Sequence, residues 1–212
     1  MSDLTRVLDW RDRQTDVNRE DACAMMRGKV VMRPLGDVLG VTLHQTAVYF
    51  TVAPYQLKAA GGDEQLARHT RFLDPNAHST AGRHGKVVIA HDPAAYVFHG
   101  HQLSSFTVGQ EHEILCDVDG NAIRPPKGWS YDEVIEAGRA GLTWYAENLP
   151  NLKFVYAHRQ AYRKAKGAKT RCCGARVFKE VGVEHGVKKL GLTIEPNRIW
   201  GGGKALPFNW YK

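Results

Sequence analysis

Three residues that are far apart in the chain are of the types that bind zinc: His44, His158 and Cys172. Each histidine directly follows a short apolar run of strand character, at residues 41–43 and 154–157, and the cysteine lies in a loop beyond the second run. Two imidazoles and one thiolate leave the fourth position of a tetrahedral zinc ion open, as metal-assisted hydrolysis requires. Spacing alone leaves a second interpretation open, because ten histidines give many chance triplets and most would be ordinary surface or core residues.

The elements that would position these residues can be predicted from the hydrophobic periodicity. Strands are predicted at residues 38–44, 86–90, 106–111 and 153–157. The clearest helix is predicted at residues 131–149, where Ser130 and Glu133 form a capping box and Pro150 ends the helix. Shorter helices are predicted near 19–26, at 55–72 with an interruption at Gly61-Gly62, and at 176–185. Because strands alternate with helices, we expect an α/β fold with a central mixed β-sheet flanked by helices.

The composition is that of a globular protein. With 43% hydrophobic and 24% charged residues, the 212-residue chain can bury one sizeable core. We expect a single catalytic domain over residues 1–212, with a core at about 38–180 and a basic, aromatic C-terminal tail at 186–212. No stretch approaches the roughly 20 apolar residues of a membrane helix, and no apolar segment of a secretory signal peptide follows the N-terminus. We therefore expect synthesis in a cytoplasm, where cysteine more readily binds a metal than forms a disulfide.

Positive charge is concentrated in the last third of the chain. Residues 151–212 contain 14 lysines and arginines against three acidic residues, whereas residues 1–150 contain 15 against 19. Such a basic segment predicts an anionic partner, and both nucleic acid and the polyanionic bacterial surface would match it. A nucleic-acid-binding protein would need no zinc site and gives no role to the motifs described next. We therefore expect no nucleic acid partner.

Six segments carry a pattern that is more specific than the spacing of the histidines. In chain order they are Leu43-His44-Gln45-Thr46-Ala47, Ala77-His78 with Gly85-Lys86-Val87-Val88, Phe98-His99-Gly100, Thr107-Val108-Gly109-Gln110-Glu111, Ala157-His158-Arg159-Gln160 and Thr170-Arg171-Cys172-Cys173-Gly174. Each is short, but together they resemble the ordered motifs of the type 2 N-acetylmuramoyl-L-alanine amidases. This family includes many bacteriophage endolysins, cytoplasmic muropeptide amidases and peptidoglycan recognition proteins. The match runs from about Val38 to Phe178.

The resemblance implies a zinc hydrolase. It implies that His44, His158 and Cys172 hold Zn2+ in a surface cleft, and that the amide between N-acetylmuramic acid and L-alanine is the bond cleaved. A zinc ion would lower the pKa of its water and polarise the amide carbonyl. Cys173 stands where the family has a proline, so it is the alternative thiolate ligand.

The resemblance also implies the acid–base groups. Glu111 would take a proton from the attacking water and pass it to the leaving amine. Glu113 is the alternative base, because residues two apart in a strand lie on the same face of the sheet. Thr170 would stabilise the oxyanion. Many relatives have a lysine at that place, so Lys169 is the alternative for this role.

Substrate and partners follow from the same resemblance. His99 and His101 are candidate substrate-binding residues, and peptidoglycan is the expected partner, with anionic cell-wall or outer-membrane polymers bound through the basic C-terminal third. We expect a monomeric phage endolysin that is made in the host cytoplasm and acts on the wall after release. A cytoplasmic muropeptide-recycling amidase and a non-catalytic peptidoglycan-binding module of the same fold are the alternatives.

Overall fold

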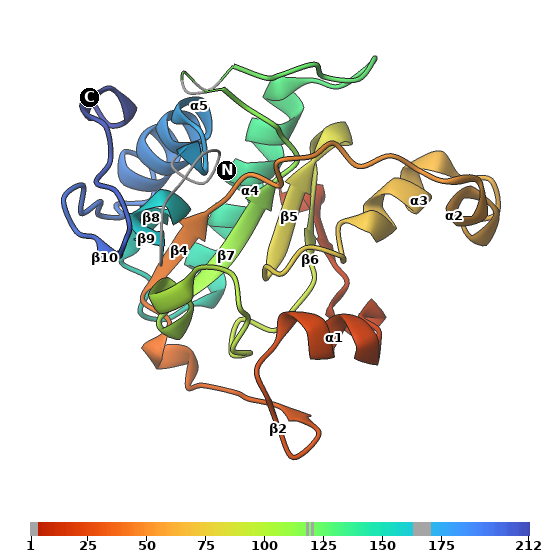
Figure 1. Ribbon diagram of the computed structural model, residues 1–212, viewed down its shortest axis with the longest axis horizontal. Coiled ribbons are helices and arrows are strands. Elements are labelled where there is room, and N and C mark those ends of the chain that lie inside the picture. The colour runs from red at the N-terminus through yellow and green to blue at the C-terminus, as the bar shows by residue number, and fades with distance from the viewer. Residues whose placement is uncertain (1–3, 118, 120, 163–170) are drawn as a thin grey trace.

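A six-stranded mixed sheet forms the centre of the molecule in the computed structural model, which describes residues 4–117, 119, 121–162 and 171–212 (Figure 1). The strand order is β1-β6-β5-β7-β4-β8. The strands are β1 (Val7–Asp9), β4 (Gly40–Leu43), β5 (Ser79–Gly82), β6 (Lys86–Ile89), β7 (Thr107–His112) and β8 (Phe154–Ala157). β5, β7, β4 and β8 run parallel to one another, whereas β6 pairs antiparallel with β5. The carboxyl ends of four neighbouring strands therefore meet at one edge of the sheet. This architecture confirms the predicted mixed α/β sheet.

The longest helix covers one face of this sheet. α4 (Tyr131–Asn148) begins at Ser130, whose hydroxyl accepts a hydrogen bond from the Glu133 amide at 3.4 Å. The remaining helices are α1 (Asp16–Ala22), α2 (Pro54–Ala59), α3 (Glu64–Arg71) and α5 (Ala175–Val177), and a π-helix, Phe178–Val187, continues α5. Apolar side chains of α4 and the π-helix, such as Leu142 and Val181, pack in one core with Leu43 and Val108 of the sheet. α4 and the π-helix therefore pack against β4 and β7 on one face of the sheet.

Two small strand pairs lie outside the central sheet. β2 (Met25–Met26) and β3 (Lys29–Val30) form an antiparallel hairpin that projects from the body of the molecule (Figure 1). β9 (Ala161–Tyr162) pairs parallel with β10 (Trp200–Gly201), which ties the C-terminal segment to the strand that follows β8. Trp210 of the aromatic tail is buried against Phe178, whereas Phe208 is 66% exposed. Among the residues described, no helix is both long and apolar enough to cross a membrane.

The four predicted strands and the main helix are all present within one or two residues of the predicted bounds. The helical stretch at 55–72 is split into α2 and α3, as Gly61-Gly62 predicted. The helix predicted near 19–26 lies earlier, at Asp16–Ala22. Residues 25–26, which were expected to end this helix, form the strand β2 instead. β1 and β5 are not among the strands that the hydrophobic periodicity predicts. β5 consists of Ser-Thr-Ala-Gly, which has little intrinsic strand preference and is held by neighbours on both sides.

Candidate metal centre

His44 and His158 lie side by side because they directly follow neighbouring parallel strands. Leu43 of β4 is in register with Ala157 of β8, so the next residue of each strand reaches the same edge of the sheet. The backbone of His44 still pairs with β7, donating to the Gln110 carbonyl at 2.9 Å. The centres of the His44 and His158 rings are 4.2 Å apart. The topology therefore brings together two residues that are far apart in the sequence.

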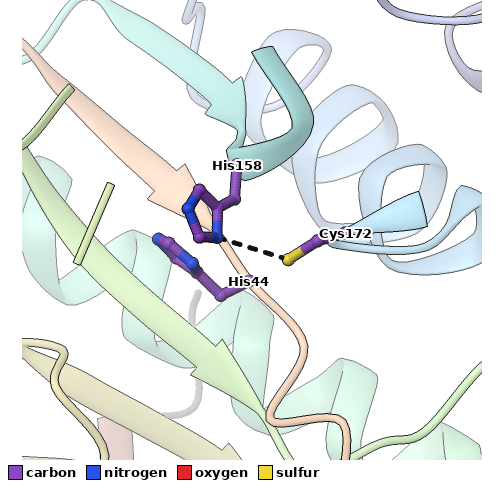
Figure 2. A group of neighbouring side chains, drawn as sticks. All are labelled: His44, His158 and Cys172. Atoms are coloured by element: carbon purple, nitrogen blue, oxygen red, sulfur yellow. Dashed lines mark hydrogen bonds between the residues drawn. The ribbon is translucent and has the colours of Figure 1, made fainter. Parts of the chain in front are cut away.

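Cys172 completes a cluster of three donor groups (Figure 2). Its Sγ lies 3.7 Å from Nδ1 of His158. Two backbone contacts hold it there: the Cys172 carbonyl accepts from the Arg159 amide at 2.9 Å, and the Gln45 amide donates to Sγ at 3.3 Å. One donor atom from each of His44, His158 and Cys172 lies within 4.8 Å of the other two.

Cys173, the alternative ligand, is not part of this group of three donors. It is fully buried in the core between the sheet and the π-helix, where its thiol lies 3.8 Å from the Gly174 carbonyl. Gly174 has a φ of +93°, and a Cβ there would lie 2.6 Å from Sγ of Cys116. The turn after the two cysteines therefore requires glycine.

The electrostatics of the three groups suit a bound cation. Burial, followed by the neighbouring His158, holds the pKa of His44 well below its ordinary value, so the ring is neutral and can ligate. Burial, followed by the charge of Glu111, holds the pKa of the Cys172 thiol well above its ordinary value. A thiolate at this place therefore needs a positive charge beside it, which a metal ion would supply.

Glu111 of β7 lies at the same edge of the sheet. Its Oε1 is 3.7 Å from Nδ1 of His44, and its side chain is 15% exposed. Its Oε2 is buried and has no hydrogen-bond partner among the residues that the structure describes. Burial raises the pKa of the Glu111 carboxyl to about 8. An unpartnered carboxylate oxygen beside the donor cluster fits a group that bonds to a water or substrate there.

Glu113, the alternative base, forms a buried ion pair with Arg83. It has no exposed surface, and its Oε1 lies 2.9 Å from Nη2 of Arg83. It also accepts hydrogen bonds from Nε and the backbone amide of Arg83 and from the Phe50 amide, each at 3.0 Å. These contacts give Glu113 a structural role in binding Arg83 and the backbone of Phe50.

The two predicted substrate-binding histidines have different environments. His101 is exposed and its ring centre is 6.4 Å from that of His158, so it lies at the rim of the cluster. His99 is only 6% exposed, and both of its ring nitrogens contact protein groups, His44 and the Thr107 carbonyl. Burial lowers the pKa of His99 to about 3, so this ring is neutral.

Lys169 and Thr170, the two candidates for oxyanion stabilisation, lie outside the described residues, as does the basic segment 163–166. Two further residues, Gln45 and His112, contact the cluster and were not predicted as site residues. Gln45 donates its amide to Cys172, and its Oε1 accepts from the Cys116 amide at 3.0 Å. His112, on the opposite face of β7, lies with Nδ1 2.8 Å from the His44 carbonyl. No local sequence pattern marks either contact, because each joins segments more than 60 residues apart.

The donor set fits zinc. Two neutral imidazoles and one thiolate are a common catalytic zinc set, and three protein ligands leave the fourth tetrahedral position for a water or substrate. His158 is partly exposed, whereas His44 and Cys172 are buried, so the cluster opens to solvent on the His158 side. Glu111, whose Oε1 lies 3.7 Å from Nδ1 of His44, is the carboxylate beside this set of donors.

Comparisons with known proteins found similarity at the level of solved structures only. No family model matches the sequence, and no curated protein does. The chain is similar to the N-acetylmuramoyl-L-alanine amidase LysC from Clostridium intestinale, at 13% identity over 77% of this chain and 91% of that one, with a TM-score of 0.45. It is also similar to the endolysin of the Thermus scotoductus bacteriophage Ph2119, at 15% identity over 82% and 98% of the two chains, with a TM-score of 0.46.

A third similar structure is the Drosophila peptidoglycan recognition protein LB, at 14% identity over 89% of this chain and 96% of that one, with a TM-score of 0.49. These proteins are of the kinds that the six sequence segments resemble. At this distance the function of the present chain has to be argued from its own site.

Proposed function

We propose that this protein is a zinc-dependent N-acetylmuramoyl-L-alanine amidase that degrades peptidoglycan. The observation that carries the proposal is the convergence of His44, His158 and Cys172 at one sheet edge, with the Glu111 carboxylate 3.7 Å from a His44 nitrogen. The substrate class comes from the resemblance of the six sequence segments, five of which contribute residues to the cluster or its immediate surroundings.

Each residue has a role in the proposed reaction. The three ligands would hold Zn2+, which supplies a Lewis acid for the amide carbonyl and a more acidic water. Glu111 accepts the proton of the attacking water through its free oxygen and returns it to the departing L-alanine amine. His101, at the exposed rim, would contact the substrate. Thr170 or Lys169 would donate to the developing oxyanion.

Within this activity we propose the endolysin role, with synthesis in the host cytoplasm and action on intact wall after release. The basic residues 151–212 support this choice over a muropeptide-recycling enzyme, because an intact wall is polyanionic. A non-catalytic binding module is disfavoured by the retained thiol of Cys172 and by Glu111, since neither would be needed for binding alone.

Incubation of the purified protein with cell-wall sacculi, with and without a chelator, tests the proposal. We expect new L-alanine amino termini that no longer form once zinc is removed and form again when zinc is restored. A Cys172→Ala variant should produce no new L-alanine amino termini. Cys173→Ala is its matched control and should produce them as the wild type does. Binding to sacculi without release would instead support the non-catalytic module, and release that is indifferent to the chelator would refute the role of zinc.

A further inference from the structure

We propose that His99 is a positioning residue that fixes which nitrogen of His44 is offered to the metal. This inference rests on the proposed zinc site and goes beyond it, since His99 would act through a ligand and not by touching substrate. Histidine can bind a metal through either ring nitrogen, and the hydrogen bond made by the other nitrogen decides between them.

The hydrogen-bond partners of His99 and His44 determine which nitrogen of each ring carries the proton. Nε2 of His99 lies 3.0 Å from the Thr107 carbonyl, which can only accept, so this nitrogen carries the proton. The ring is only 6% exposed, which disfavours a second proton, and a neutral imidazole with its proton on Nε2 offers Nδ1 as an acceptor. That Nδ1 lies 3.2 Å from Nε2 of His44. Nε2 of His44 must then be the donor, which leaves Nδ1 of His44 with its lone pair free.

The free nitrogen of His44 is the one that faces the site. Nδ1 of His44 lies 3.7 Å from Oε1 of Glu111. In Figure 2 the His44 ring turns one nitrogen toward His158 and Cys172 and the other away from them. With only 1% of His44 exposed, water cannot fix its tautomer, so the neighbouring ring must do so.

The fold holds His99 firmly in the orientation that this role requires. A Cβ on Gly109 would lie 2.5 Å from Cγ of His99, so the ring rests directly on the bare backbone of β7. The ring of His78 packs edge-on against His99, with centres 5.6 Å apart, and His78 is itself fixed through the Gly109 amide, which donates to its Nδ1 at 3.0 Å. A ring packed on these sides cannot readily turn to offer its other nitrogen.

Two measurements test the inference. The first needs no variant: nitrogen-15 NMR of the metal-free protein should find the His44 ring protonated at Nε2. The second is zinc affinity, measured by competition with a chromogenic chelator. His99→Leu should weaken zinc binding by about 10- to 100-fold, the usual effect of losing a group that orients a histidine ligand.

Two further variants make the affinity measurement specific. His99→Asn should restore most of the affinity, because its Oδ1 takes the place of the acceptor Nδ1. Gln102→Leu changes an exposed residue of the same segment and should bind zinc as the wild type does. An Nδ1–H tautomer of His44, or unchanged zinc affinity in His99→Leu, overturns the inference. If instead the wild-type protein binds no zinc, the proposed function itself fails, so the two failures are distinguishable.

Discussion

Replacing Glu113 with glutamine should destabilise the fold strongly while leaving the proposed chemistry intact. Glu113 is fully buried and neutralises Arg83, which is 5% exposed. Glutamine would leave the guanidinium buried without a counter-charge, and breaking such a pair by removing one partner costs about 3–5 kcal/mol. The new NH2 group would also face amide donors of Arg83 or Phe50 that now bond to a carboxylate oxygen. For a chain of this size the loss corresponds to a fall in Tm of roughly 6–20 °C.

The assay is denaturant unfolding at pH 7 with zinc in excess, so that metal occupancy is equal in all variants. Asp9→Asn is the matched control. It removes the partner of Arg11, but the side chains of Arg11 and Asp9 are 40% and 44% exposed, and such an exposed pair contributes only about 0–1 kcal/mol. A Glu113→Gln variant within about 1 kcal/mol of the wild type would refute the buried-ion-pair argument. Loss of turnover in the folded variant would make Glu113, and not Glu111, the base.

Three further predictions concern the site and its surroundings. Glu111→Gln should bind zinc normally and lose about 10²–10⁴-fold in turnover, measured on sacculi, and full turnover would remove the proposed base. Cys172→Ala should lose zinc by metal analysis whereas Cys173→Ala keeps it, and the reverse result would exchange the ligand assignment. Burial lowers the pKa of both His69 and His91 to about 4, below the ordinary value of 6.5, so the unfolded chain binds more protons between these values. The free energy of unfolding of the metal-free protein should therefore fall as the pH drops from 6.5 to 4, with about 2 kcal/mol lost per histidine at pH 5, and equal stability at pH 7 and 5 would contradict this.

The parts of the fold that could be predicted are those with a local signal. β6 and β8 are apolar runs, and α4 combines a capping serine with an apolar face, so each is specified by residues within its own segment. β5 could not be found in this way, because its small and polar residues are buried only through their partners β6 and β7. Secondary structure of this kind depends on tertiary contacts.

The same distinction applies to the site. His44 and Cys172 could be named from the sequence because each belongs to a recognisable segment. The roles of the neighbouring residues Glu113 and His99 could not be assigned from the sequence. Whether Glu113 is a base or half of an ion pair depends on Arg83, 30 residues away, and whether His99 contacts substrate or a ligand depends on His44, 55 residues away. Such assignments require the pairing of β4, β5 and β7, which no single segment encodes.

The most direct test of the metal centre is a cobalt titration of the metal-free protein, followed by the thiolate-to-cobalt charge-transfer absorption. The arrangement of two imidazoles and one thiolate predicts saturation at one equivalent of cobalt per chain, with a band that is present in Cys173→Ser and absent in Cys172→Ser. A protein that takes up no cobalt, or a Cys172→Ser variant that keeps the same band, would contradict the assignment of the ligands and, with it, the proposed enzyme.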